Sequence, residues 1–412
     1  MSKTNKFKIF NDPIYGFITI PSTLIFDLIE HPYFQRLRHI SQMGLSSMVY
    51  PGAHHTRFHH ALGCMYLMQK AVRVLRSKGV AINNEEEQAL YITILLHDIG
   101  HGPFSHALEG FFIPKLSHEA ISLRYMESLN SDFDGGLTEA IRIFSNKHPR
   151  NFLYQLISSQ LDMDRLDYLK RDSFYTGVVE GSINSDRLIA MLHVKDDELV
   201  IEEKGIYSIE KFLLSRRFMY WQVYLHKTGM IAEQVLKRIL KRAKSLVLEG
   251  MKLAGSTNLQ YLLSIDGKEN MDYEKQINAF TELDDHDIWA AIKEWQKHDD
   301  FILASLSKMI VQRNLPKVVL SAKQFNTKEV QKLKDKALEI NGMDNKTINY
   351  FVFQGSVKNQ AYHLKDGGIK VLLKNGEVKE WLSVDTQFNT IALTDVTVKY
   401  FLAYPKDLFV LK

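Results

Sequence analysis

The sequence predicts a mainly α-helical protein with a smaller C-terminal α+β lobe. Apolar residues recur at helical spacing from Ser22 to about residue 252. Beyond Arg313 the pattern changes to short runs rich in β-branched and aromatic residues, which is typical of strands. The pair Asn375-Gly376 between two polar stretches is a hairpin signal. We therefore expect an N-terminal segment at residues 1–21, a helical domain at residues 22–312 and the lobe at residues 313–412.

The first elements follow from local turn and capping signals. The sequence DPIYG at residues 12–16 lies between short apolar pairs and predicts a small β-hairpin. Ser22 and Thr23 can cap the helix that follows. Apolar periodicity predicts further helices at residues 85–97, 137–144, 152–172, 185–192, 209–248 and 285–295. Residues 250–281 are polar and contain Gly and Asn, and strands are expected at residues 318–320, 350–353 and 369–372.

Composition narrows the class of protein. With 45% hydrophobic and 24% charged residues, the chain can bury a large core, which excludes a disordered or fibrous protein. A net charge of +4 is too small to attract polyanions in general, so nucleic-acid binding is not indicated. Cys64 is alone, the N-terminus lacks an apolar signal core, and no apolar run approaches the roughly 20 residues of a membrane span. These features predict a cytoplasmic protein with no membrane partner.

Histidines are concentrated in the first third of the chain. Of 16 histidines, ten lie between residues 31 and 118, and histidine is the commonest metal ligand. His97 and Asp98 are adjacent at the end of an apolar helix, where Gly100, Gly102 and Pro103 interrupt it. An imidazole beside a carboxylate suits Fe, Mn, Mg or Zn. The alternative is a histidine that simply hydrogen-bonds to its neighbouring aspartate.

Two other segments carry compatible chemistry. His60 lies in the first turn of an apolar helix, three residues after Arg57, whose guanidinium suits phosphate. In the helix at residues 161–172, Asp164, Tyr168 and Asp172 follow at i, i+4 and i+8, so they share one face over about 12 Å. That face can hold a metal at one end and a nucleotide sugar against the phenol. The alternative is an ordinary solvated face of charged residues.

In order and spacing, these segments resemble the HD-domain deoxynucleoside triphosphate triphosphohydrolases, a family that includes the animal restriction factor with a sterile-alpha-motif domain. The resemblance covers roughly residues 7–300 and is strongest in the ten-residue motif HDIGHGPFSH at residues 97–106. The other matching stretches are NDPIYG at 11–16, FQRLR at 34–38, PGA at 51–53, RFHH at 57–60, DMDRLDY at 162–168 and YLHK at 224–227.

The resemblance implies a role for individual residues. A divalent metal is expected on His60, His97, Asp98 and Asp164, and triphosphate oxygens on Arg57 and Arg165, with His101 close to the phosphates. The expected acid that protonates the departing 5′ oxygen is His106, assisted by Glu109 and His118. Sugar contacts are expected from Gln42, Tyr168, Asp172 and Tyr224. The implied reaction releases a deoxynucleoside and inorganic triphosphate. The remaining histidines of the cluster, His31, His39, His54, His55 and His59, are expected to be ordinary surface residues.

The resemblance also implies a regulatory nucleotide site. Lys8, Gln35 and Arg38 match one activator position, and a neighbouring nucleotide is matched by Asn11, Val49, Arg187, His226 and Lys227. Two departures weaken this match. Glu30 replaces Asp, and Glu202 stands where a basic residue is expected, which opposes a triphosphate. For Gln35, Arg36 and Arg38 the alternative is a solvated helix face. We expect a homo-oligomer, dimer or tetramer, with nucleotide-responsive activity.

Two other functions remain open at the level of sequence. The first is an HD-domain hydrolase acting on another nucleotide or on a nucleic-acid phosphoester. The second is a nucleotide-sensing protein whose HD site is vestigial, against which stand the four intact ligands and three intact acid residues. Identification of inorganic triphosphate among the products separates the first from the leading hypothesis.

Overall fold

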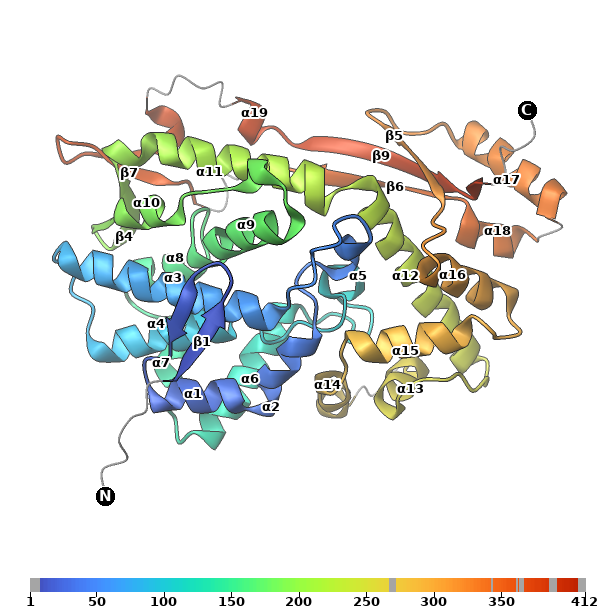
Figure 1. Ribbon diagram of the computed structural model, residues 1–412, viewed down its shortest axis with the longest axis horizontal. Coiled ribbons are helices and arrows are strands. Elements are labelled where there is room, and N and C mark those ends of the chain that lie inside the picture. Colours follow the sequence, from blue (N-terminus) through green and yellow to red (C-terminus); the bar gives the residue numbers. More distant parts are fainter. Residues whose placement is uncertain are drawn as a thin grey trace.

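A computed structural model describes residues 8–266, 272–341, 344–360, 362, 367–384 and 391–406. It confirms the expected fold class, a helical core with a smaller α+β region toward the C-terminus (Figure 1). Among the described residues, we find no helix that combines the length and the apolar character needed to cross a bilayer.

The N-terminal hairpin forms as expected. Strands β1 (Ile9–Asp12) and β2 (Gly16–Thr19) pair antiparallel, with Ile9 opposite Thr19. Asp12 ends β1, and its Oδ1 accepts hydrogen bonds from the backbone N–H groups of Ile14 (2.9 Å) and Tyr15 (3.0 Å). Gly16 has a φ of +74°, which a glycine adopts without strain. The turn therefore points the second carboxylate oxygen of Asp12 into the protein, toward the candidate active site described below.

The helices from the hairpin to residue 176 provide most of the site. Ser22 caps the first of them, since its Oγ accepts from the N–H of Ile25, as expected. Helices α3 and α4 form the buried centre, in which leucine, isoleucine and methionine side chains pack almost free of solvent. The bounds are α1 (Thr23–Glu30), α2 (Pro32–Gln35), η1 (Arg36–His39), η2 (Gly44–Met48), α3 (Arg57–Ser77), α4 (Asn84–Leu96), α5 (Ser105–Leu108), α6 (His118–Asp132), α7 (Thr138–Phe144), α8 (Asn151–Ile157) and α9 (Met163–Thr176).

The single helix expected at residues 152–172 is wrong, because the chain breaks between α8 and α9. Asp162 is the cause. Its carboxylate accepts from the N–H of Ser159 (2.8 Å) and from the N–H of Arg165 (2.7 Å), so it caps α9 and closes the preceding turn. The break places Asp164 in the first turn of α9, at the end that meets α3 and α4.

The second half of the helical region differs from expectation at three places. The helix expected at residues 185–192 forms as α10 but ends at Ala190, and Leu192 begins a hairpin of β3 and β4. The long helix expected at residues 209–248 is two helices separated by a π-helical turn, and His226 caps the second. Residues 250–281 contain α13 and α14. The bounds are η3 (Val179–Gly181), α10 (Ser185–Ala190), β3 (Leu192–Lys195), β4 (Glu198–Glu202), η4 (Glu203–Gly205), α11 (Ile206–Met219), η5 (Tyr220–Tyr224), α12 (Lys227–Leu248), α13 (Thr257–Ser264), α14 (Tyr273–Thr281), α15 (Asp285–Trp295) and α16 (Phe301–Val311).

The C-terminal region contributes to two sheets. Its bounds are β5 (Lys317–Ser321), α17 (Thr327–Asn341), α18 (Asn345–Phe351), β6 (Phe353–Asn359), β7 (Lys370–Leu372), β8 (Val378–Glu380), η7 (Trp381–Ser383), α19 (Ile391–Thr394) and β9 (Thr397–Tyr404). One sheet is antiparallel, in the order β5-β9-β6; its long strand β9 runs along the upper edge of the molecule in Figure 1. In the other sheet, of order β3-β4-β7-β8, β7 runs parallel to β4, so residues on both sides of position 313 share one sheet.

The strand expectations for this region are partly met. The Asn375-Gly376 turn joins β7 to β8, with a φ of +88° at Gly376, and residues 318–320 lie in β5. The strand expected at residues 350–353 is wrong for its first half, because Tyr350 and Phe351 end α18 and β6 begins at Phe353.

Candidate active site

Four expected metal ligands converge from three helices. His60 comes from the first turn of α3, His97 from the end of α4 with Asp98 next to it, and Asp164 from the first turn of α9. Nε2 of His60 lies 3.1 Å from Oδ1 of Asp164 and 3.8 Å from Oδ2 of Asp98. Nε2 of His97 lies 3.5 Å from Asp98 and 3.6 Å from Asp164. The ligand atoms of His60, His97 and Asp164 all lie within 4.8 Å of one another, together with the Sγ of Cys64.

The two imidazoles are oriented as metal ligands are. Nδ1 of His60 lies 2.7 Å from a carboxylate oxygen of Asp167, and Nδ1 of His97 lies 2.6 Å from the carbonyl oxygen of Ile94. Each Nδ1 therefore donates a hydrogen bond away from the cluster, and each Nε2 faces the carboxylates, where a bound cation would replace the proton that this nitrogen otherwise carries. Nε2 of His97 is buried and too far from Asp98 and Asp164 for a good hydrogen bond. The donor set thus fits a divalent cation.

The charges around the cluster favour ionised carboxylates. Burial by itself would raise the pKa of the Asp164 carboxyl, but the imidazoles of His60 and His97 hold it well below its ordinary value. Burial raises the pKa of the Cys64 thiol, which packs 3.5 Å from the ring nitrogens of His60. Cys64 is therefore a neutral thiol beneath His60, and the cluster offers nitrogen and oxygen ligands.

A buried ion-pair network supports His60 from behind, and sequence reasoning missed it. Asp167 accepts hydrogen bonds from Nε and Nη2 of Arg171 at 2.9 and 3.0 Å, and Nη1 of Arg171 donates to Oδ2 of Asp12 at 2.8 Å. Burial would raise the pKa of Asp167, but Arg171 and His60 lower it to about 2. The network joins the hairpin, α9 and the metal ligand. Its only sequence signal is the i, i+4 spacing of Asp167 and Arg171.

The two expected phosphate-binding arginines are placed differently. Arg57 is buried, donates from Nη1 to Oδ2 of Asp98 at 2.5 Å and from Nε to Oγ of Ser105 at 3.1 Å, and lines the cavity that adjoins the His/Asp cluster. Arg165 pairs with Asp162 and is not among the residues that line this cavity. The guanidinium of Arg57 is therefore held in place facing the metal cluster.

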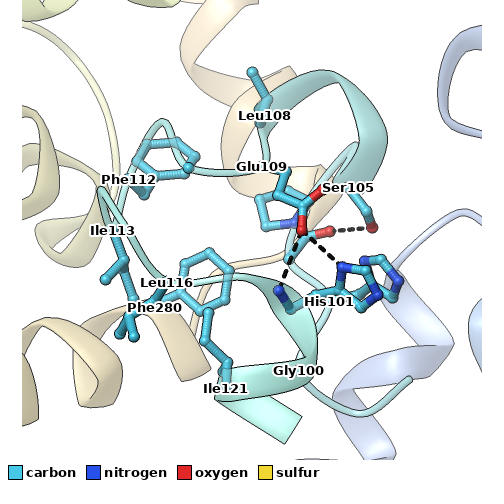
Figure 2. A pocket seen from close by; sticks show the side chains of 14 residues that line it. Gly100, His101, Ser105, Leu108, Glu109, Phe112, Ile113, Leu116, Ile121 and Phe280 are labelled. Atoms are coloured by element: carbon cyan, nitrogen blue, oxygen red, sulfur yellow. Dashed lines mark hydrogen bonds and ion pairs between the residues drawn. The ribbon is translucent and has the colours of Figure 1, made fainter. Parts of the chain in front are cut away.

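Two stacked imidazoles form the next part of the site. The rings of His101 and His118 lie 3.9 Å apart at an angle of 14°. Oε1 of Glu109 lies 2.7 Å from Nδ1 of His118 and accepts from the N–H of His118 at 3.2 Å, as the dashed lines in Figure 2 show. Burial and the nearby Arg57 charge hold the pKa of His101 well below its ordinary value, so its imidazole is neutral near pH 7. The expected acid His106 belongs to α5, but its side chain lies outside the described part of the structure.

A cavity of about 390 Å³ extends from the metal cluster between α9, α12 and the π-helical turn. Its walls include six expected substrate contacts, namely Gln42, Arg57, His101, Tyr168, Asp172 and Tyr224. Tyr224 donates to Oδ2 of Asp172 at 2.7 Å, and its ring meets that of Tyr168 edge to face. Because π-helical turns are uncommon and often occur at functional sites, the turn that carries Tyr220 and Tyr224 marks this wall.

His55 corrects one expectation. It was expected at the surface, but the residue is only 2% exposed, and its ring stacks on Tyr175 and lies 2.7 Å from Oδ1 of Asp172. Asp172 is therefore held at both oxygens, by His55 and by Tyr224. This fixed carboxylate presents its remaining lone pairs to the cavity.

Two buried charged residues tie the loops of the site together, and sequence reasoning missed both roles. Oδ2 of Asp285 accepts from the N–H of Ser41 at 2.9 Å, and its Oδ1 accepts from the N–H of Phe104 at 3.0 Å. Nη1 of Arg36 donates to the carbonyl oxygens of Ile99 (3.1 Å) and His101 (2.8 Å). Arg36 is buried, so the solvated face considered for it is wrong. Asp285 thereby joins the loop of Gln42 to the segment that follows His101.

This bridge gives a prediction. We expect Asp285→Asn to lower kcat by about 10- to 100-fold, because an amide can accept from only one of the two N–H groups and small misplacements of catalytic segments are costly. The metal content should stay unchanged, as determined by elemental analysis. Burial raises the pKa of Asp285 to about 6, so protonation below that pH weakens the bridge, and activity should fall.

The raised pKa of Asp285 changes the stability of the fold in the opposite direction from the activity. The folded pKa is above the unfolded value near 4, so ionised Asp285 destabilises the fold as the pH rises from about 4 to 6. Asp285→Asn should therefore flatten the stability profile in that window while it removes activity. Wild-type kcat in Asp285→Asn, or loss of its metal, would contradict the bridging role.

The expected regulatory residues lie in separate parts of the chain. Nε of Arg38 donates to Oε1 of Gln35 at 2.8 Å, and the guanidinium covers the ring of Phe58. Lys8 lies over the ring of Phe26, and Asn11 is in β1. Arg187 donates to Ser208, while Val49 follows η2 and His226 and Lys227 begin α12. Glu202 forms ion pairs with Lys78 and Lys204, which neutralise its charge.

Comparisons with known proteins agree with this geometry. The HD domain family matches residues 57–172, and the HD associated region matches residues 183–254. A crystal structure of a phosphohydrolase from Bacteroides thetaiotaomicron superposes with a TM-score of 0.93 and is 47% identical, covering 97% of this chain and 100% of that one.

Two curated relatives extend the comparison. The uncharacterized Bacillus subtilis protein YwfO is 30% identical over 424 residues, which cover 98% of this chain and 94% of that protein. The deoxynucleoside triphosphate triphosphohydrolase SAMHD1 of Bos taurus is 29% identical over 326 residues, 68% of this chain and 53% of that protein. The match to the triphosphohydrolase thus spans about half of its length.

Proposed function

This chain belongs to the HD-domain phosphohydrolases. Because it is also similar to SAMHD1, a deoxynucleoside triphosphate triphosphohydrolase, we propose that it hydrolyses deoxynucleoside triphosphates to the deoxynucleoside and inorganic triphosphate. The observation that carries the proposal is the cavity that adjoins the His/Asp cluster. It combines a buried arginine for phosphate, a pair of stacked imidazoles and a tyrosine wall with a fixed carboxylate, which are the groups that a nucleotide requires.

The metal would be held by His60, His97, Asp98 and Asp164, and when bound it polarises phosphate oxygens and lowers the pKa of coordinated water. Arg57, fixed by Asp98 and Ser105, would bind phosphate oxygens and offset their charge. Glu109 orients His118 against His101, so this pair supports proton transfer to the leaving 5′ oxygen, together with His106.

The tyrosine wall would select the sugar. Tyr168 and Tyr224 line the cavity beside Asp172, whose carboxylate can accept a hydrogen bond from a 3′ hydroxyl. A phenol edge against C2′ leaves no space for a ribose 2′ hydroxyl. By shape alone this is worth roughly 1–3 kcal/mol, so we expect deoxyribonucleotides to be preferred by about 10- to 100-fold.

Product identification tests the proposal. Purified protein should release a deoxynucleoside and intact inorganic triphosphate from deoxynucleoside triphosphates in the presence of Mn²⁺ or Mg²⁺, as resolved by ion-exchange chromatography. Ribonucleoside triphosphates are the matched control. Orthophosphate or pyrophosphate as the only inorganic product would overturn the reaction and point to another phosphoester.

We propose further that the protein forms a nucleotide-responsive homo-oligomer, using Lys8, Gln35, Arg38 and the other residues of the regulatory set. The support for this proposal is the likeness of these residues to the regulatory positions of the triphosphohydrolase family. The same assay, run for each substrate with each added nucleotide, measures activation. Light scattering under the same conditions measures the mass of the assembly.

A further inference from the structure

Glu233 is a carboxylate on the cavity wall that nothing in the fold uses. It lies in the second turn of α12, is half-buried, and faces the cavity that contains the expected sugar contacts. Within the described part of the chain, no side chain or backbone N–H donates a hydrogen bond to it, and no lysine, arginine or histidine lies within 4 Å of it. Other carboxylates of the site, such as Asp172, Asp167 and Asp285, each accept at least two contacts.

The surroundings make this carboxylate costly to leave unpaired. Burial raises the pKa of Glu233 to about 7, although Lys237 on the next turn acts in the opposite direction. A half-buried acceptor with no donor among the described residues keeps only part of its hydration. A ligand that supplies N–H donors at this position therefore gains more than it would from an exposed carboxylate.

Glu233 lies close to the loop that carries Gln42, one of the expected sugar contacts. Its Oε1 lies 3.9 Å from the position that a Cβ on Gly44 would occupy, two residues after Gln42. Leu225, which also lines the cavity, follows Tyr224 and leads into α12. Met43 and Leu225 add apolar surface on which a flat ring can pack. A nucleobase attached to a sugar at Gln42 and Tyr224 would lie in this part of the cavity.

We infer that Glu233 recognises the nucleobase and selects guanine. This inference rests on the proposed function. Guanine presents two adjacent donors, N1–H and the N2 amino group, and these match the two oxygens of one carboxylate. Adenine and cytosine present one amino donor next to a ring acceptor, and the acceptor faces the second oxygen unfavourably. Thymine places its single N–H between two carbonyl oxygens, so a carboxylate repels it on both sides.

The test compares base preference in the wild type and in Glu233→Gln. An amide presents one acceptor and one donor, which suits adenine and cytosine better than guanine. We expect kcat/KM for dGTP, relative to dATP and dCTP, to fall by about 10- to 100-fold, the usual discrimination of one bidentate contact. A ratio between substrates does not depend on the fraction of folded enzyme. The matched control is Glu249→Gln, at the exposed end of the same helix, which should keep the wild-type ratios.

A binding arm separates this inference from the proposed function. Deoxynucleosides carry no phosphate to hydrolyse, and their affinities are measured by calorimetry with both proteins. We expect the wild type to bind deoxyguanosine most tightly and Glu233→Gln to lose that preference. If no triphosphate is hydrolysed but this binding pattern holds, the proposed reaction is wrong and the base site stands. If the substrate ratios and the deoxynucleoside affinities are the same in both proteins, Glu233 does not read the base.

Discussion

The Asp164→Ala variant should lose its bound metal and at least about a thousandfold of its hydrolytic activity. Asp164 faces both imidazoles, at 3.1 Å from Nε2 of His60 and 3.6 Å from Nε2 of His97. Without Asp164, the remaining expected ligands are two neutral imidazoles and Asp98. Asp98 already pairs with Arg57 at 2.5 Å. Removal of one group that stabilises developing charge commonly costs 10²–10³-fold, and loss of the metal adds to that.

Two measurements check this result. Elemental analysis of protein purified without chelator reports the metal, and release of deoxynucleoside reports activity. Asp186→Ala is the matched control, since Asp186 is an exposed aspartate on α10 that pairs with Lys70. A full complement of metal in Asp164→Ala would show that the cation is held elsewhere. Chelation of the wild type should reproduce the loss of activity, and added Mn²⁺ should restore it.

Sequence reasoning succeeded where the relation between residues is local. A helix places residues four apart on one face, so Asp164, Tyr168 and Asp172 could be assigned to one side of α9 before its neighbours were known. It also succeeded at the hairpin turns, because DPIYG and Asn375-Gly376 have strong conformational preferences. One such signal was missed. Asp196 and Asp197 both have positive φ values, of 51° and 60°, and they form the turn between β3 and β4.

The rest depended on tertiary contacts that no local pattern contains. Asp285 is 181 positions beyond Phe104, yet its carboxylate is bound to that residue's N–H. His55 belongs to a polar pair of histidines and is buried only because Asp172 and Tyr175 of α9 cover it. The sequence alone does not distinguish a charged side chain that is solvated from one that is paired in the core. Arg36 is a second example, because its buried guanidinium donates to a backbone carbonyl oxygen.

The buried pair behind His60 gives the other large effect. We expect Asp167→Ala to lower the free energy of unfolding by about 3–5 kcal/mol, because Arg171 is fully buried and keeps Asp12 as its single carboxylate partner. Metal affinity should fall by about 10- to 100-fold as well, since Nδ1 of His60 loses the acceptor that orients its ring. Urea denaturation and metal titration measure the two losses separately.

A double variant distinguishes the structural role of Asp167 from its role toward the metal. In Asp167→Leu/Arg171→Met the uncompensated charge is removed with its partner, and apolar side chains of similar size fill the space. Stability should then recover most of the loss, as replacements of buried ion pairs by apolar groups commonly do, whereas metal affinity should stay low because His60 still lacks its acceptor. Recovery of both would mean that Asp167 only balances the charge of Arg171. A loss below about 1 kcal/mol in Asp167→Ala, the size typical of an exposed pair, would mean that the network does not hold the hairpin to the site. The contrast between the two variants therefore assigns Asp167 to the metal, to the fold, or to both.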